Sequence, residues 1–304
     1  MIQLTQLQKR FGNRLAVEAL DLHVPRGEIF GLLGHNGAGK STTIGMLLGQ
    51  VWPTAGEVRV CGHDVTRDRA QALAKVGAIF EAPEFYEYLS GWRNLEILAG
   101  YTAPTPPARL REVVAWVGLS GREHSKVRTY SHGMRARLAL AQALLPGPEL
   151  LILDEPTNGL DPGGIHEMRE TIRRLHTEFG LTILLSSHLL SEVEQLCSRI
   201  AVLNQGRKVF DGSLAEARQD QSWVRLRTHD FPAATRELLT AGLIAHERDG
   251  EFLALTPDTS IAAVVKHLVA LGFPIHEIAP EKQTLENFYL SLMKEEGRIL
   301  NPKP

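Results

Sequence analysis

Residues 34–41 combine glycines, a lysine and a hydroxyl side chain in the pattern of a phosphate-binding loop. Their sequence is Gly34-His35-Asn36-Gly37-Ala38-Gly39-Lys40-Ser41. Glycines let the backbone wrap closely around a phosphate, and successive amide N–H groups present partial positive charge to it. We expect Lys40 to reach the β- and γ-phosphates of a nucleotide, the Ser41 hydroxyl to coordinate Mg²⁺, and Thr42 to belong to the same nucleotide-binding set.

The segments around this loop match the setting that the motif requires. An apolar run at 29–33 predicts a strand before the loop, and a helix is expected to start near Lys40. Without that setting, the same residues would also fit a glycine-rich turn before a helix.

A second apolar run, Leu150-Leu151-Ile152-Leu153, ends in the acidic pair Asp154-Glu155. The carboxyl end of a buried parallel strand lies beside such a loop, so Asp154 suits a second ligand of Mg²⁺. Glu155 is not needed for the metal and is a candidate general base, polarising the water that attacks the γ-phosphorus. A salt bridge to a nearby arginine is the alternative role. Together, loop and acids predict ATP hydrolysis with ATP and Mg²⁺ as cofactors.

A further motif, Tyr130-Ser131-His132-Gly133-Met134, precedes a helix expected at 135–145, which runs into the strand of Asp154. Ser131 and Gly133 start this helix, and its N-terminus can also bind an anion. Because the chain's own loop already holds the γ-phosphate, the second helix is best used on the nucleotide of a partner. Alone, the motif also fits an ordinary serine-capped helix.

The order of these motifs resembles the nucleotide-binding subunit of an ATP-binding cassette (ABC) transporter, in which the segment with Ser131 and Gly133 is the signature sequence. The resemblance implies a homodimer in head-to-tail contact, with two ATP molecules sandwiched between the copies. His132 replaces a glycine and Met134 a glutamine of the commonest family pattern, whereas the two binding positions are kept.

Two later segments also match the family. Residues 156–162 resemble its D-loop, which implies that Asp161 lies at the dimer interface near both nucleotides, although a plain turn before a helix has the same residue types. His188 follows an apolar strand at 181–185, and the matching family histidine senses the γ-phosphate and positions the water. His188 is thus a candidate catalytic residue, with a structural role at a strand end as the alternative.

Phe11 and Glu81 match family positions in part. Phe11 stands where the family stacks an aromatic ring on adenine, with a core position as the alternative. Glu81 follows an expected strand at 76–80, where the family carries a glutamine that touches Mg²⁺ and couples to the membrane partner. Glutamate adds negative charge near an acidic metal site, which puts that role in doubt and leaves direct ligation of Mg²⁺ by Glu81 as an alternative.

The string at 79–95 is similar to one branch of the family, the exporters of peptide antibiotics of the bacitracin and lantibiotic kind. This similarity implies a substrate class, antimicrobial peptides or drugs. Three aromatic residues of the string, Phe85, Tyr86 and Tyr88, would form a groove that receives a helix of the permease, or would pack in the interior.

The chain has 304 residues and a formal net charge of −2. Without a basic excess, we expect no nucleic-acid partner. No apolar run approaches the roughly 20 residues that span a bilayer, and the N-terminus lacks the layout of a signal peptide. The membrane connection is therefore expected through a separate integral membrane permease, which would hold this protein at the inner face of the cell membrane. Cys61 and Cys197 lack metal-like spacing and are interpreted as reduced thiols of a cytoplasmic protein.

The expected fold class is α/β, that of a P-loop NTPase ABC nucleotide-binding domain. Residues 1–213 would hold a parallel core sheet, an N-terminal antiparallel β subdomain with a turn at Gly12-Asn13, and a helical subdomain at about 94–145. Residues 214–304 alternate strands and helices, including helices at 233–240 and 261–271, which predicts a small C-terminal α+β domain. Dimerisation or regulation is its expected role, with an inert structural extension as the alternative.

We interpret the chain as an ATP-binding subunit whose hydrolysis of ATP to ADP and phosphate powers an export permease. One alternative is a soluble ABC ATPase acting on ribosomes or DNA, but such proteins usually carry a long coiled-coil insertion or two cassettes. Another is a P-loop kinase or GTPase, which would leave Ser131-His132-Gly133 unexplained and would require an Asn-Lys-x-Asp string that is absent from the sequence.

Overall fold

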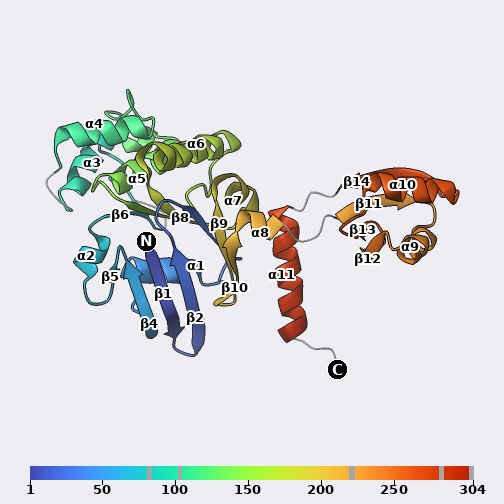
Figure 1. Cartoon of the computed structure of the whole chain (residues 1–304). Helices are drawn as coiled ribbons and strands as arrows, with labels where there is room; N and C mark the ends of the chain where they lie inside the picture. Colours follow the sequence, from blue (N-terminus) through green and yellow to red (C-terminus); the bar gives the residue numbers. More distant parts are fainter. Residues whose placement is uncertain (81–83, 102–104, 219–222, 281–283, 301–304) are drawn as a thin grey trace. The chain divides into compact units, whose positions relative to one another are not determined.

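The computed structural model describes residues 1–80, 84–101, 105–218, 223–280 and 284–300. The chain divides into two compact units, Met1–Leu214 and Ala215–Pro304. Figure 1 shows the first unit in blue to yellow and the second in orange to red. Each unit is described by itself.

The first unit begins with an antiparallel sheet in the order β2-β1-β4-β5. Its strands are β1 (Ile2–Phe11), β2 (Arg14–Val24), β4 (Ala55–Val60) and β5 (His63–Asp64). The predicted turn joins β1 to β2, and Gly12 there has φ +54°, a left-handed conformation that glycine adopts without steric cost. Ile2, Leu4 and Leu7 of β1 are buried, as a sheet with one buried face requires, and the three-residue step to Leu7 coincides with a register shift in the pairing with β2.

A second sheet has the order β10-β9-β3-β8-β7-β6. Its strands are β3 (Ile29–Leu33), β6 (Val76–Ile79), β7 (Leu150–Asp154), β8 (Thr182–Ser187), β9 (Arg199–Asn204) and β10 (Arg207–Ser213). All neighbours pair in parallel except β10, which lies antiparallel to β9. The central strands are nearly continuous apolar runs because helices cover both faces of the sheet.

Helices form the remaining layers of the first unit. They are α1 (Lys40–Leu47), α2 (Arg69–Leu73), α3 (Gly91–Ala99), α4 (Pro107–Trp116), α5 (His132–Leu144), α6 (Pro162–Phe179) and α7 (Leu190–Leu196), with a 3₁₀ turn at Val127–Thr129. Helix α1 lies between the two sheets and shares its buried Ile44, Met46 and Leu47 with both. Figure 1 shows α5, α6 and α7 on the other face of the second sheet. Helices α3, α4 and α5 pack on one another as the predicted helical subdomain.

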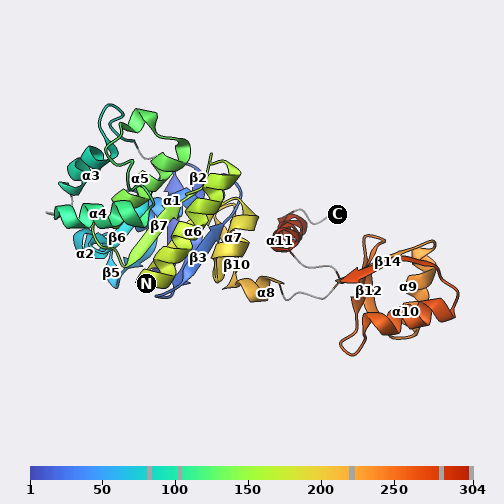
Figure 2. The same cartoon turned by 90° about the horizontal axis from the view of Figure 1, so that it is seen from above.

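The second unit holds an antiparallel sheet in the order β12-β13-β11-β14. Its elements are β11 (Trp223–Thr228), α9 (Phe231–Thr240), β12 (Ile244–Arg248), β13 (Phe252–Leu255), α10 (Ile261–Ala270), β14 (Ile275–Pro280) and α11 (Leu285–Leu300), while α8 (Leu214–Arg218) begins at the boundary. Helices α9 and α10 pack together and share a core with the sheet (Figure 2). The predicted α/β fold with a small α+β domain is therefore confirmed.

Two helices begin earlier than the sequence predicts. Helix α9 begins at Phe231 rather than at residue 233, because Asp230 caps it by accepting a hydrogen bond from the Ala233 N–H at 3.0 Å. Helix α5 begins at His132, directly after its cap Ser131, so the predicted start at Ser131 and Gly133 is correct and the range 135–145 began too late. In both cases the capping side chain, and not the first periodic apolar residue, sets the start.

Candidate nucleotide site

The loop between β3 and α1 is pressed against neighbouring backbone, and glycine is required at its closest approach. Gly39 caps α1 with φ +108°, and a Cβ at this position would lie 2.7 Å from the carbonyl oxygen of Ala16. Any side chain would therefore clash and adopt a strained conformation. The sequence Gly-Ala-Gly brings the loop close to β2 and leaves its amide groups at the helix N-terminus, where an anion is favoured.

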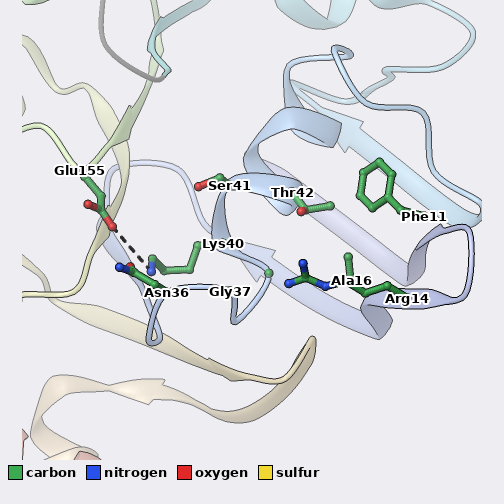
Figure 3. Close-up of a pocket in the computed structure, with 10 residues that line it drawn as sticks. Phe11, Arg14, Ala16, Asn36, Gly37, Lys40, Ser41, Thr42 and Glu155 are labelled. Carbon is green, nitrogen blue, oxygen red and sulfur yellow. Dashed lines mark ion pairs between the residues drawn. The ribbon is translucent and has the colours of Figure 1, made fainter.

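Lys40, the first residue of α1, points back over the loop. Its side chain is buried, and its Nζ donates a hydrogen bond to the carbonyl oxygen of Gly34 at 2.7 Å. The same Nζ lies 3.7 Å from Oε1 of Glu155, shown as the dashed line in Figure 3. The loop thus holds an ammonium group beside the candidate base, where the terminal phosphates of a nucleotide are expected.

A cavity of about 340 Å³ runs along this loop. It is lined by Phe11, Arg14, Ala16, Asn36, Gly37, Gly39, Lys40, Ser41, Thr42 and Glu155 (Figure 3). Phe11 is half exposed at 50%, which rules out the alternative of a core position. The Lys9 ammonium lies 4.7 Å from the centroid of the Phe11 ring. The cavity therefore joins an aromatic face at one end to a lysine and a carboxylate at the other.

Ser186 on β8 forms hydrogen bonds with both acidic residues, Asp154 at the end of β7 and Glu155 directly after it. It stands opposite Asp154 in the parallel register, and its hydroxyl donates to Oδ1 of Asp154. The Glu155 N–H donates to the same hydroxyl at 3.0 Å. Glu155 has φ +47°, a left-handed conformation that costs a non-glycine residue of order 1 kcal/mol or more and persists only when its surroundings impose it. The hydrogen bond that the Glu155 N–H donates to Ser186 is one such constraint, and sequence reasoning missed Ser186.

The Glu155 carboxylate lies between two cationic or potentially cationic groups. Nδ1 of His188 is 3.1 Å from Oε2 of Glu155, and Nζ of Lys40 approaches the other oxygen. Among the described residues, Glu155 thus pairs with Lys40 and His188 and not with the arginine of the alternative role. His188 follows β8 directly, so the ends of β7 and β8 place the candidate base and the candidate γ-phosphate sensor side by side.

A second cavity, of about 590 Å³, shares Ser41 and Glu155 with the first. Its lining includes Asp154, so the two candidate Mg²⁺ ligands border one space, and a hydroxyl with a carboxylate is a hard oxygen donor set that suits this ion. Among the described residues, no group of three or more His, Cys, Asp or Glu side chains could hold a metal ion. Glu81 lies outside the described residues.

Both cysteines are free, and burial raises the pKa of each thiol.

Comparisons with known proteins agree with this geometry. A family model described as ABC transporter matches residues 17–158. The chain is 35% identical to the bacitracin transport ATP-binding protein BcrA of Enterococcus faecalis, over 96% of each protein. The chain belongs to the family of ABC transporter ATP-binding proteins. It is likewise 35% identical to the daunorubicin resistance ATP-binding protein DrrA3 of Streptomyces coeruleorubidus, over 96% of this chain and 95% of that one.

A solved structure supports the ABC fold. The ATP-binding cassette MJ0796, in a dimeric post-hydrolysis state bound to ADP and Pi, superposes with a TM-score of 0.63 at 23% identity, over 70% of this chain and 99% of that one. Because the chain belongs to the family shown by the family model and the relatives above, the protein is an ATP hydrolase of the ABC type and the ATP-binding subunit of a transporter. Within the described part of the chain, no helix has the length and apolar composition needed to cross a bilayer.

Some predicted site residues of this ABC ATPase lie away from the nucleotide cavity. Ser131 and Asp161 cap α5 and α6, accepting hydrogen bonds from Met134 N and Gly164 N at 3.2 Å each. Gly133 lies in the first turn of α5. Their roles toward a second nucleotide stay predictions.

Three residues of the loop, Gly34, His35 and Ala38, form hydrogen bonds that hold the loop in place. Gly34 accepts the Lys40 bond, and the Ala38 carbonyl accepts from the Gly206 N–H at 3.0 Å. The His35 ring contacts Oδ1 of Asn204 at 2.9 Å, which ties the loop to the end of β9. Sequence reasoning missed Asn204, because the β9 end and the loop are far apart along the chain.

Proposed function

We propose that two copies of this subunit close around two ATP molecules and that hydrolysis drives them apart, moving a separate permease. The observation that carries the proposal is that Lys40 and Glu155 line one cavity and His188 contacts Glu155, while Ser131 and Gly133 line neither of the two cavities described above. A Cβ on Gly133 would meet nothing closer than the Ser131 hydroxyl at 4.0 Å. The N-terminus of α5 therefore has room for the γ-phosphate of a partner's nucleotide.

In this proposal the predicted site residues have separate tasks. Phe11 stacks on the adenine, and the loop amides and Lys40 hold the phosphates. Ser41 and Asp154 would hold Mg²⁺, which would neutralise charge on the phosphate oxygens. Glu155 accepts the proton of the attacking water, and His188 orients that water beside the γ-phosphate. Asp161, at the start of α6, lies near both sites in the closed dimer.

The aromatic segment before α3 is proposed to receive the permease. Tyr86 and Tyr88 are 44% and 67% exposed and meet edge to face at 6.1 Å, so the alternative of interior packing fails for both, whereas Phe85 is partly buried. This segment is hydrogen-bonded to α3, because the Tyr86 N–H donates to Oδ1 of buried Asn94 at 2.8 Å. Such an exposed aromatic surface suits a helix of a membrane protein, which would hold this chain at the cytoplasmic face.

A link runs from this segment to the signature helix. Glu87 pairs with Arg135 of α5 at 2.5 Å. A displacement of the aromatic segment would therefore be transmitted to α5, and through α5 to the nucleotide of the partner copy. This connection gives a physical route by which permease and hydrolysis are coupled.

The cargo is proposed to be a peptide antibiotic or a drug, because the relatives named above serve bacitracin transport and daunorubicin resistance. Deleting the gene from its native host should lower resistance to at least one of these compounds several-fold. Wild-type protein should restore resistance and Glu155→Gln should not. Unchanged susceptibility to both compounds would contradict the cargo class while leaving the ATPase assignment intact.

A further inference from the structure

Arg14 stands directly across the first hairpin from Phe11. The two residues pair at the end of β1 and the start of β2, joined by the two-residue turn with Gly12 at φ +54°. Side chains two residues apart share a face of a strand, so Arg14 and Ala16 both border the nucleotide cavity. Figure 3 shows the guanidinium directed toward the loop, between Phe11 and Lys40.

The Arg14 guanidinium lies against the phosphate-binding loop itself. Its Nη2 would be 3.6 Å from a Cβ built on Gly37, within the run of loop residues that faces the cavity. Among the described residues, none forms a hydrogen bond or ion pair with the Arg14 side chain. The acidic residue that lines this cavity, Glu155, is already engaged by Lys40 and His188.

Electrostatics favour an anion at this position. Arg14 shares this cavity with Lys40 and the positive N-terminus of α1, and Glu155, the carboxylate in the lining, pairs with Lys40 rather than with Arg14. The Arg14 charge and the N-terminus of α1 therefore repel each other. A phosphate placed among them relieves that repulsion and gives the guanidinium charge-assisted hydrogen bonds. Because arginine presents a planar set of donors, it suits phosphate better than a lysine would.

We propose that Arg14 binds the α-phosphate of the nucleotide. The inference rests on the proposed placement of the base on Phe11 and of the terminal phosphates on Lys40, because Arg14 lies between these two residues. The contact lies outside the loop motif at 34–41 and adds a second cationic side chain to the site. Arg14 is thus a residue that sets affinity for the nucleotide before chemistry begins.

The test is a calorimetric titration of the purified full-length chain with ATP, ADP and the α-thio analogue of ATP, without Mg²⁺. We expect Arg14→Ala to weaken ATP and ADP alike, by about 3- to 10-fold, since an exposed charged contact is partly screened by water. It should also shrink the wild-type preference for ATP over the α-thio analogue. In steady-state assays the same variant should raise KM and leave kcat unchanged, whereas Arg14→Lys should recover part of the affinity.

Arg10→Ala is the matched control. Arg10 precedes Phe11 by one residue, but its guanidinium bonds the Asn13 carbonyl at 3.4 Å and does not line the cavity. The control should bind ATP as the wild type does. If Arg14→Ala binds ATP with wild-type affinity, Arg14 does not contact the nucleotide. If its preference for ATP over the α-thio analogue equals that of the wild type, the α-phosphate is not the group that Arg14 contacts.

Lys40→Ala separates failure of this inference from failure of the proposed function. If Lys40→Ala loses ATP affinity while Arg14→Ala does not, only the role of Arg14 is overturned. If Lys40→Ala binds ATP as tightly as the wild type, the placement of the nucleotide in this cavity is itself wrong.

Discussion

A Glu155→Gln variant should bind ATP as tightly as the wild type and hydrolyse it about 10²- to 10⁴-fold more slowly, the usual contribution of a positioned general base. The amide keeps the size and hydrogen-bonding reach of the carboxylate but cannot accept the proton of the attacking water. The Glu155 backbone is held by Ser186, so the side chain of glutamine should occupy the same place. Phosphate release and ATP titration measure the two quantities separately.

Glu178→Gln provides the control for this experiment. Glu178 is an exposed glutamate near the end of α6 and borders neither cavity. Its substitution should leave kcat and ATP affinity unchanged. If Glu155→Gln hydrolyses ATP at the wild-type rate, Glu155 is not the general base. If the variant no longer binds ATP, the main task of Glu155 is to position Lys40.

Adding Ser131→Arg to Glu155→Gln should abolish ATP-dependent dimerisation. With ATP, Glu155→Gln alone should accumulate as a dimer because hydrolysis no longer separates the copies. A long side chain at the start of α5 would fill the space in which the partner's γ-phosphate is proposed to lie. The dimer fraction should fall because the association constant drops by at least about 10-fold, a loss of roughly 1.4 kcal/mol. Light scattering after size exclusion, with and without ATP, measures this fraction.

Ser90→Arg serves as the matched control for the loss of a helix cap. Ser90 caps α3 by accepting from the Arg93 N–H at 3.1 Å, just as Ser131 caps α5. Both substitutions should reduce stability by about 1 kcal/mol, the usual value of an N-cap. Only Ser131→Arg should block the dimer. An intact ATP-dependent dimer in that variant would contradict the proposed sandwich.

Local patterns made the loop and the acids predictable. Asp154 ends a short apolar strand, and Lys40 begins the helix after another. In each case one short stretch of sequence shows both the residue and the element that positions it. The C-terminal fold was likewise visible as alternating strand and helix patterns. The order of its strands was not, because pairing of β11 with both β13 and β14 joins segments far apart in the chain.

The residues that sequence reasoning missed, Ser186 and Asn204, also contact segments that are far away along the chain. Ser186 reaches Asp154 through the register of β7 and β8, and Asn204 reaches the loop from the end of β9. A single sequence contains no signal for either contact. Arg14 differs, because the predicted turn at Gly12-Asn13 already makes it the partner of Phe11, and that pairing could have identified it.

The most direct test of the transporter account is to purify the tagged protein from gently solubilised membranes of its native host and to identify what accompanies it by mass spectrometry. The account predicts a multi-spanning permease that is retained by the wild type and lost when Tyr86 and Tyr88 are both changed to aspartate. Recovery of ribosomal proteins or DNA-repair factors, with no membrane protein, would contradict it.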